Sequence, residues 1–193
     1  MNNNKVKILK IEILSDNWYT LNKVTFEYQK NNGTLETQSR EAYDRGNGAT
    51  ILLYNKESET VILTKQFRLP TYINGNEDGM MIEACAGLLD KDNPEDCIKR
   101  ETEEELGYEI SDVKKVFEVY MSPGSVTEIL YFFIAEYSKS MKINDGGGLE
   151  EEQEEIEVLE LDINKALEMI DLGEIKDAKT IMLLQHVRLK GIL

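Results

Sequence analysis

Three glutamates at helical spacing are the residues of this sequence best placed to do chemistry. Glu101 and Glu105 are four positions apart, and Glu104 follows Glu101 by three, so on a helix their carboxylates would form one stripe. Like charges at this spacing repel by roughly 0.2–0.5 kcal/mol per pair. A divalent cation such as Mg²⁺, which takes oxygen ligands, would relieve that repulsion. The stripe predicts a metal site, with a solvated acidic face as the alternative that charge alone allows.

The element that must position these glutamates is a helix from Asn93 to Leu106. Asn93 suits the N-cap, and Pro94 at the first helical position loses no hydrogen bond. Gly107 is a typical stop signal. On this helix Arg100 can reach Glu104 one turn away and orient it.

The remaining pattern predicts strands on both sides of a soft boundary near residue 45. Before the boundary, alternating apolar and polar residues predict a small antiparallel sheet from strands at residues 5–14, 19–29 and 34–43. After it, the composition becomes strongly apolar and predicts further strands, including residues 49–54, 61–67 and 82–89, with a polar loop at 71–80 and two closing helices. We therefore expect an α+β or α/β domain, a mixed sheet sandwiched by helices, at residues 46–193, preceded by the N-terminal sheet at residues 1–45.

Composition excludes several classes of partner. The formal charge is −15, from 22 basic and 37 acidic residues, so no surface for nucleic acid or anionic lipid is expected. There is no apolar run of 18 residues and no cleavable leader, so no membrane association is predicted. Cys85 and Cys97 suggest reduced thiols, and a cytoplasmic protein is expected.

Residues 100–108, Arg-Glu-Thr-Glu-Glu-Glu-Leu-Gly-Tyr, resemble the second half of the Nudix box, R-E-U-x-E-E-x-G-U with U a bulky apolar residue. Gly87 resembles the glycine that opens the box. Asn93 stands where the box has a glutamate, Thr102 stands where an aliphatic residue is usual, and the interval from Gly87 to Arg100 is one residue short.

The resemblance extends along nearly the whole chain, to the GDP-mannose pyrophosphatase branch of the ADP-ribose-pyrophosphatase-like Nudix enzymes. The segments that carry it are residues 44–49, 65–68, 82–90, 120–124, 146–148 and 173–177. It implies the Nudix fold and a homodimer in which residues 1–45 complete the partner's substrate pocket.

The implied metal is Mg²⁺, with Mn²⁺ able to substitute. By resemblance, Glu101, Glu105 and the backbone carbonyl of Ala86 are ligands, and Glu104 supports them or binds through water. A further ligand comes from the acidic loop and is Glu154, with Glu152 as catalytic base. Alignment from the glycine side of that loop would instead make Glu152 the ligand.

The resemblance also implies a set of substrate-binding residues. Arg68 and Arg40 can hold phosphate or sugar oxygens through paired N–H donors, and Trp18 or Tyr19 can stack on guanine, with packing as the alternative. The full set is Trp18, Tyr19, Thr20, Ser39, Arg40, Glu41, Arg68, Glu128 and Lys179.

The expected activity is Mg²⁺-dependent hydrolysis of the diphosphate of a nucleoside-diphosphate sugar. GDP-mannose, split into GMP and mannose 1-phosphate, is the favoured substrate, and ADP-ribose or another nucleotide sugar is the nearest alternative. A catalytically silent nucleotide-binding module is a different class, and the intact Glu101, Glu104 and Glu105 argue against it. An acidic protein-interaction domain would leave the matching glycines unexplained.

Overall fold

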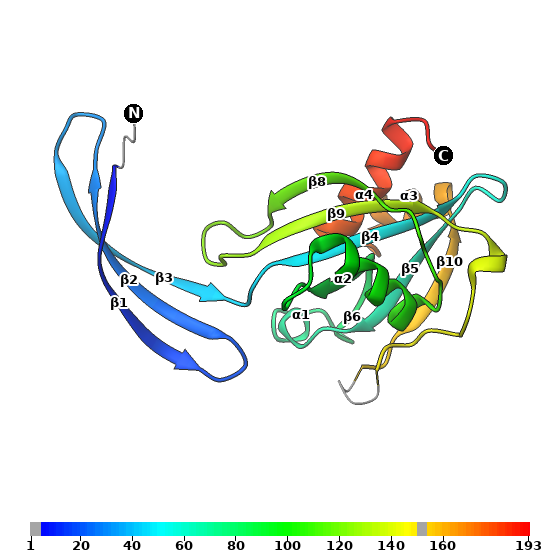
Figure 1. The fold of residues 1–193 in the computed structure, drawn as a ribbon, viewed down its shortest axis with the longest axis horizontal. Helices are drawn as coiled ribbons and strands as arrows, with labels where there is room; N and C mark the ends of the chain where they lie inside the picture. The colour runs from blue at the N-terminus through cyan, green and yellow to red at the C-terminus, as the bar shows by residue number, and fades with distance from the viewer. Residues whose placement is uncertain (1–4, 150–153) are drawn as a thin grey trace. The chain divides into compact units, whose positions relative to one another are not determined.

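The structure of the protein is a computed structural model that describes residues 5–149 and 154–193. The chain divides into two compact units (Figure 1), one of Met1–Asn47 with Tyr120–Ile129 and the other of Gly48–Val119 with Leu130–Leu193. Each unit has its own sheet.

In the first unit, the described residues form a three-stranded antiparallel sheet in the order β1-β2-β3. Its strands are β1 (Val6–Asp16), β2 (Thr20–Gln29) and β3 (Leu35–Asp44). Leu9 is an extra residue in β1, because Ile8 pairs with Phe26 and Lys10 already pairs with Thr25. This bulge keeps the apolar residues before and after it on one face. The predicted N-terminal antiparallel sheet is confirmed.

The second unit is built on a mixed sheet. Its order is β10-β5-β4-β9-β8, with β6 added to β5 and β7 added to β4 in the described chain. β4 pairs in parallel with β9, whereas its pairings with β5 and β7 are antiparallel. The strands are β4 (Gly48–Asn55), β5 (Thr60–Phe67), β6 (Met80–Glu83), β7 (Cys85–Leu88), β8 (Lys114–Tyr120), β9 (Ile129–Glu136) and β10 (Glu157–Asp162).

Helices cover this sheet. They are α1 (Leu69–Ile73), α2 (Pro94–Glu101), a π-helical turn η1 (Thr102–Leu106), a 3₁₀ turn η2 (Lys139–Met141), α3 (Ile163–Asp171) and α4 (Ala178–Leu189). Both α2 and α4 contact β4. Residues 49–53 of β4 are all buried; Ala49, Ile51 and Leu53 pack in one core with Cys97 and Ile98 of α2. A strand buried on both faces reads as a continuous apolar run, and the predicted mixed sheet with helices is confirmed.

Two local expectations are wrong. Residues 82–89 form not one strand but the end of β6 and all of β7, because the backbone N–H of Ala84 donates to Thr180 Oγ1 (2.6 Å) instead of to a neighbouring strand. Residues 71–80 are not wholly loop, since α1 begins at Leu69 with Pro70 in its first turn. Pro70 suits that position because its missing N–H has no partner there in any helix.

Candidate functional site

The acidic helix begins and ends as its sequence predicts. The Asn93 side chain accepts from the backbone N–H groups of Glu95 (3.1 Å) and Asp96 (3.0 Å), so this departure from the Nudix box caps α2. The helix widens into η1 after Glu101 and stops at Gly107, whose φ is 78°. Thr102, the other departure, is buried, and its hydroxyl donates to the carbonyl of Ile98 (2.6 Å). A polar residue is therefore accommodated there without a lost hydrogen bond.

Glu105 is the most unusual side chain of this helix, because it is only 2% exposed. Within the described residues, its Oε2 atom has no hydrogen-bond partner. Burial raises the pKa of Glu105 to about 8; the thiol of Cys85 opposes the rise, and the charges of Glu101 and Glu154 add to it. A buried carboxylate with an unused oxygen among like charges is stabilised by a cation.

Glu101 lies directly over the backbone of β7. A Cβ atom on Gly87 would come within 2.1 Å of the Glu101 carboxyl carbon, so only glycine leaves room for this carboxylate beside Ala86. Arg100 contacts Glu101 Oε1 through Nη2 and Glu104 Oε2 through Nη1, each at 2.9 Å. The predicted contact of Arg100 with Glu104 is therefore present, and Arg100 holds two of the three glutamates.

The Gly-rich segment brings a fourth carboxylate to the helix. The N–H of Gly147 donates to the carbonyl of Glu105 (2.9 Å), and that of Gly148 to the carbonyl of Glu104 (3.2 Å). Glu154 then folds back over this segment: its Oε2 accepts from the N–H of Leu149 (3.2 Å), and a Cβ on Gly148 would come within 2.5 Å of that oxygen. Glu152 lies outside the described residues.

These residues fit a divalent cation by their chemistry. Glu105 supplies a buried oxygen that is unpaired in the part of the chain that the structure describes, and Glu101 and Glu154 are close enough to raise the pKa of Glu105. Across residues 5–149 and 154–193, however, no three His, Cys, Asp or Glu side chains are grouped closely enough to hold a metal ion as they stand.

A second charged group surrounds Glu83, at the end of β6. Glu83 accepts from Arg68 Nε and from Lys179 Nζ, both at 2.6 Å, and Lys179 also contacts Asp177 (3.0 Å). Burial raises the pKa of Glu83, but the two cations outweigh burial and leave it below its ordinary value. The structure thus joins the predicted Arg68 and Lys179 through a residue that was not predicted. A lone charge in an apolar stretch, as at Glu83, is a signal that could have found it.

The remaining predicted residues belong to the first unit. Trp18 is 82% exposed, and its ring lies edge-on to Tyr19 at 6.2 Å between centroids. Tyr19 in turn packs edge-on against Tyr43 (5.8 Å) and lies under the guanidinium of Arg45 (5.5 Å). Arg45 Nε is 3.5 Å from Glu128 Oε1. Tyr43 and Arg45 complete this cluster and were not predicted, since their contacts depend on strand pairing.

Strand alternation separates the predicted residues of β3. Arg40 and Glu41 are adjacent, so their side chains point to opposite faces of the sheet. Ser39, Glu41 and Tyr43 share one face, whereas Arg40 shares the other with Thr20, because Arg40 pairs with Val24 and Thr20 with Asp44. Within one chain, a single base can be met by Glu41 or by Arg40, but not by both.

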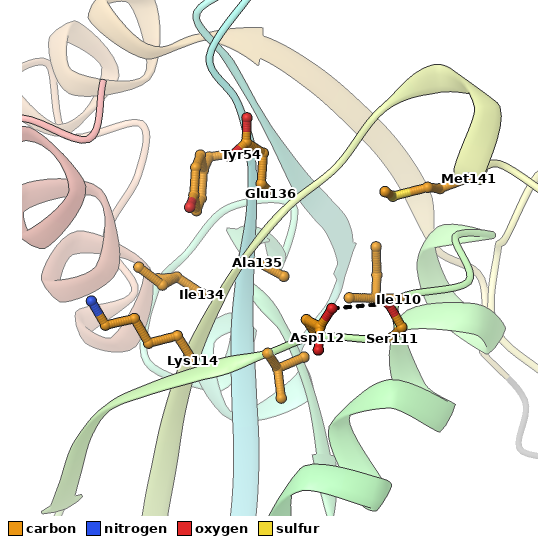
Figure 2. A pocket seen from close by; sticks show the side chains of 10 residues that line it. Tyr54, Ile110, Ser111, Asp112, Lys114, Ile134, Ala135, Glu136 and Met141 are labelled. Atoms are coloured by element: carbon orange, nitrogen blue, oxygen red, sulfur yellow. Dashed lines mark hydrogen bonds between the residues drawn. The ribbon is translucent and has the colours of Figure 1, made fainter.

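A cavity elsewhere in the second unit contains none of the predicted residues (Figure 2). It is lined by side chains that include Tyr54, Lys114, Glu136 and Met141. Tyr54 lies near the end of β4, whereas the candidate site lies beside Ala86, which pairs with Thr50 near the start of that strand. This cavity is therefore distinct from the candidate site.

The mixed sheet and the glutamate-bearing helix define a Nudix domain. The family model described as NUDIX domain matches residues 44–183, and the chain belongs to the Nudix family. Residues 5–43 match the model of the GDP-mannose pyrophosphatase NudK N-terminal domain.

Similarity to curated relatives indicates a more specific class of protein than the family model does. The chain is 56% identical to the GDP-mannose pyrophosphatase of Yersinia enterocolitica, over 98% of both chains. It is 56% identical to that of Pectobacterium atrosepticum, over 96% of this chain and 95% of the relative. A crystal structure of an ADP compounds hydrolase shares the fold, with a TM-score of 0.71 and 20% identity, over 97% of this chain and 95% of that one. Within the described residues, no helix has the length and apolar character needed to cross a membrane.

Gly87→Ala should damage the site while leaving the fold intact. The added Cβ meets the far end of the Glu101 side chain, which can swing aside at little cost in stability but then leaves its place beside Ala86. We expect Mg²⁺ affinity, measured by titration calorimetry, to fall about tenfold or more, with the thermal unfolding midpoint nearly unchanged. Gly124→Ala is the matched control, because its Cβ would meet nothing within 4 Å. Equal Mg²⁺ affinity in the two variants would contradict this placement of Glu101.

Proposed function

We propose that this protein hydrolyses GDP-mannose to GMP and mannose 1-phosphate with Mg²⁺, which Mn²⁺ can replace. The observation that carries the chemistry is the buried Oε2 of Glu105, which has no hydrogen-bond partner among the described residues, beside Glu101 and Glu154. The names of relatives at 56% identity over nearly their full length support the substrate. The free, buried cysteines are in keeping with a reducing cytoplasm.

Glu101, Glu105, Glu154 and the carbonyl of Ala86 would hold the metal. Bound there, Mg²⁺ would neutralise diphosphate oxygens and lower the pKa of a water molecule. Arg100 contacts Glu101 and Glu104, each at 2.9 Å. Glu104 is thereby placed to accept a proton or to support the ligands. Glu152, outside the described residues, is the other proposed base.

Glu101→Gln and Glu105→Gln should each lower kcat by about a hundredfold or more, because each removes an anionic ligand rather than a packing contact. Initial rates of GDP-mannose hydrolysis in Mg²⁺ would measure this. Glu103→Gln, an exposed residue of the same turn, is the control and should retain the parental rate. If both ligand variants kept activity within threefold of the parent, the metal assignment would be wrong.

Base recognition is proposed for the face of the first sheet that carries Glu41. Guanine presents N1–H and N2–H donors that a carboxylate accepts, whereas adenine does not offer that pair. Ser39 and Tyr43 share the face with Glu41, and Tyr19 packs against Tyr43. An acceptor and a stacking ring on one face favour guanine.

The kcat/KM for GDP-mannose should exceed that for ADP-ribose by at least about tenfold, since a mismatched buried polar group costs about 1–3 kcal/mol. Glu41→Ala should reduce this ratio, because it should lower kcat/KM for GDP-mannose more than kcat/KM for ADP-ribose. Parallel assays of the two substrates, quantifying GMP and AMP, would measure both effects. A preference for ADP-ribose would refute the GDP-mannose proposal and leave the hydrolase proposal standing.

We also propose a homodimer formed through the first unit. On β1, the bulge puts Val6, Ile8, Ile11 and Ile13 on one face, where they are 43–64% exposed. An apolar face of this kind on a three-stranded sheet marks an interaction surface that needs to be covered. A second copy would bury this face, and residues 1–45 of each chain would complete the partner's substrate pocket.

Ile11→Lys with Ile13→Lys should give a monomer by light scattering at micromolar concentration, because two charges cannot be buried unpaired in an apolar interface. Thr37→Lys, on the opposite face of the same sheet, should remain a dimer. A parent protein that is monomeric and fully active at this concentration would contradict the proposal.

A further inference from the structure

Glu83 lies between the two cations of the second unit. It ends β6, Arg68 directly follows β5, and Lys179 lies in the first turn of α4 (Figure 1). Each cation takes a different oxygen: Arg68 Nε contacts Oε2 and Lys179 Nζ contacts Oε1, both at 2.6 Å. Glu83 is 5% exposed, so this carboxylate depends on both partners for its charge to be tolerated.

The two cations have unlike surroundings. The Lys179 side chain is 12% exposed and is shared between Glu83 and Asp177, at 2.6 and 3.0 Å. The Arg68 side chain is 40% exposed, and its hydrogen bond to Glu83 uses Nε. Lysine has a single compact charge, whereas arginine has a rigid fork with donors beyond Nε. Arg68 can therefore be held by Glu83 and still present its two Nη groups.

Arg68 also acts on the acidic centre. Burial is the main cause that raises the pKa of Glu105, and the charge of Arg68 is among the influences that oppose the rise. The charge of Arg68 therefore reaches Glu105. A diphosphate held at the carboxylates through a cation would need positive charge on that side.

We propose that Glu83 is a positioning residue that aims the Nη groups of Arg68 at the substrate diphosphate, while Lys179 holds the other oxygen of the Glu83 carboxylate. This inference rests on the proposed diphosphate substrate. Glu83 itself touches no reacting atom.

The physical reason is the geometry of the carboxylate. A glutamine at position 83 has one oxygen acceptor and one N–H₂ donor, so it cannot accept from both cations. In Glu83→Gln one cation meets a donor and moves away, and Arg68 loses its fixed direction. When Lys179 is lost, the buried charge of Glu83 is neutralised by Arg68 alone and the Glu83 side chain is held less firmly. Arg68 is then affected indirectly.

The test is a double-mutant cycle read by binding of inorganic pyrophosphate in Mg²⁺, measured by titration calorimetry. Arg68→Gln, Glu83→Gln and Lys179→Met should each raise Kd, the first two by about tenfold to a hundredfold. Combining Glu83→Gln with Arg68→Gln should add almost nothing, because both act through one contact. Glu168→Gln, which removes a surface pair with Lys165 (3.0 Å), is the matched control and should bind as the parent does.

A spectroscopic readout separates positioning from general damage. In ¹⁵N-labelled protein, the Arg68 Nε–H signal, identified by its loss in Arg68→Gln, should shift in Glu83→Gln while the backbone amide spectrum stays that of the folded parent. With GDP-mannose, Glu83→Gln should raise KM more than it lowers kcat.

Three results would overturn the proposal: an unchanged Nε–H signal, additive losses in the cycle, or a parent that does not bind pyrophosphate in Mg²⁺. Absence of GDP-mannose hydrolysis by a parent that binds pyrophosphate would instead refute the proposed function and leave the role of Glu83 intact.

Discussion

The candidate site depends on one physical constraint, which is the mutual repulsion between carboxylates that lie near the buried Glu105. Glu105 is buried, one of its oxygens is unpaired in the described structure, and Glu101 and Glu154 raise its pKa further. The nearby arginines offset this charge only in part, since Arg100 is shared between Glu101 and Glu104 and Arg68 is held by Glu83. Negative charge therefore remains concentrated around Glu105, and protons and cations compete for the same oxygens.

Glycines allow that concentration. Gly87 leaves space for the Glu101 carboxylate, and Gly148 leaves space for that of Glu154. Gly146 sits so close to the carbonyl of Glu105 that a Cβ would come within 2.3 Å of its oxygen, and its φ of 66° is one that other residues rarely adopt. Backbone N–H groups from this segment donate to carbonyls of the widened helix turn, so main-chain hydrogen bonds join the acid-bearing loop to the helix.

What the sequence predicts well is what local chemistry decides. The limits of the acidic helix follow from Asn93 and Gly107, and the first sheet follows from alternation along residues 5–43. Contacts between residues that are distant in the sequence could not be predicted from it. The break between β6 and β7 depends on Thr180, which is 96 positions from Ala84, and the partners of Glu83 come from two other elements.

The candidate site shows the same difference between contacts of residues close in the sequence and contacts of distant residues. Arg100 and Glu104 are four residues apart, and their contact was predicted. Tyr43 and Arg45 join Tyr19 only after β2 and β3 pair, so neither was predicted. The widening of the helix at Thr102 has no local signal in the sequence and was not predicted.

The bulge at Leu9 makes β1 tolerant of a change in its length. Val6 and Ile8 occupy even positions and Ile11 and Ile13 odd ones, yet all four face the same way because one residue is left out of the pairing. Losing a single residue between Ile8 and Ile11 would remove the bulge and leave these two isoleucines two positions apart, which is the regular spacing along one face of a strand. During evolution, a one-codon deletion at this point would therefore keep the apolar surface whole, whereas the same deletion between Val6 and Ile8 would turn Val6 to the opposite side.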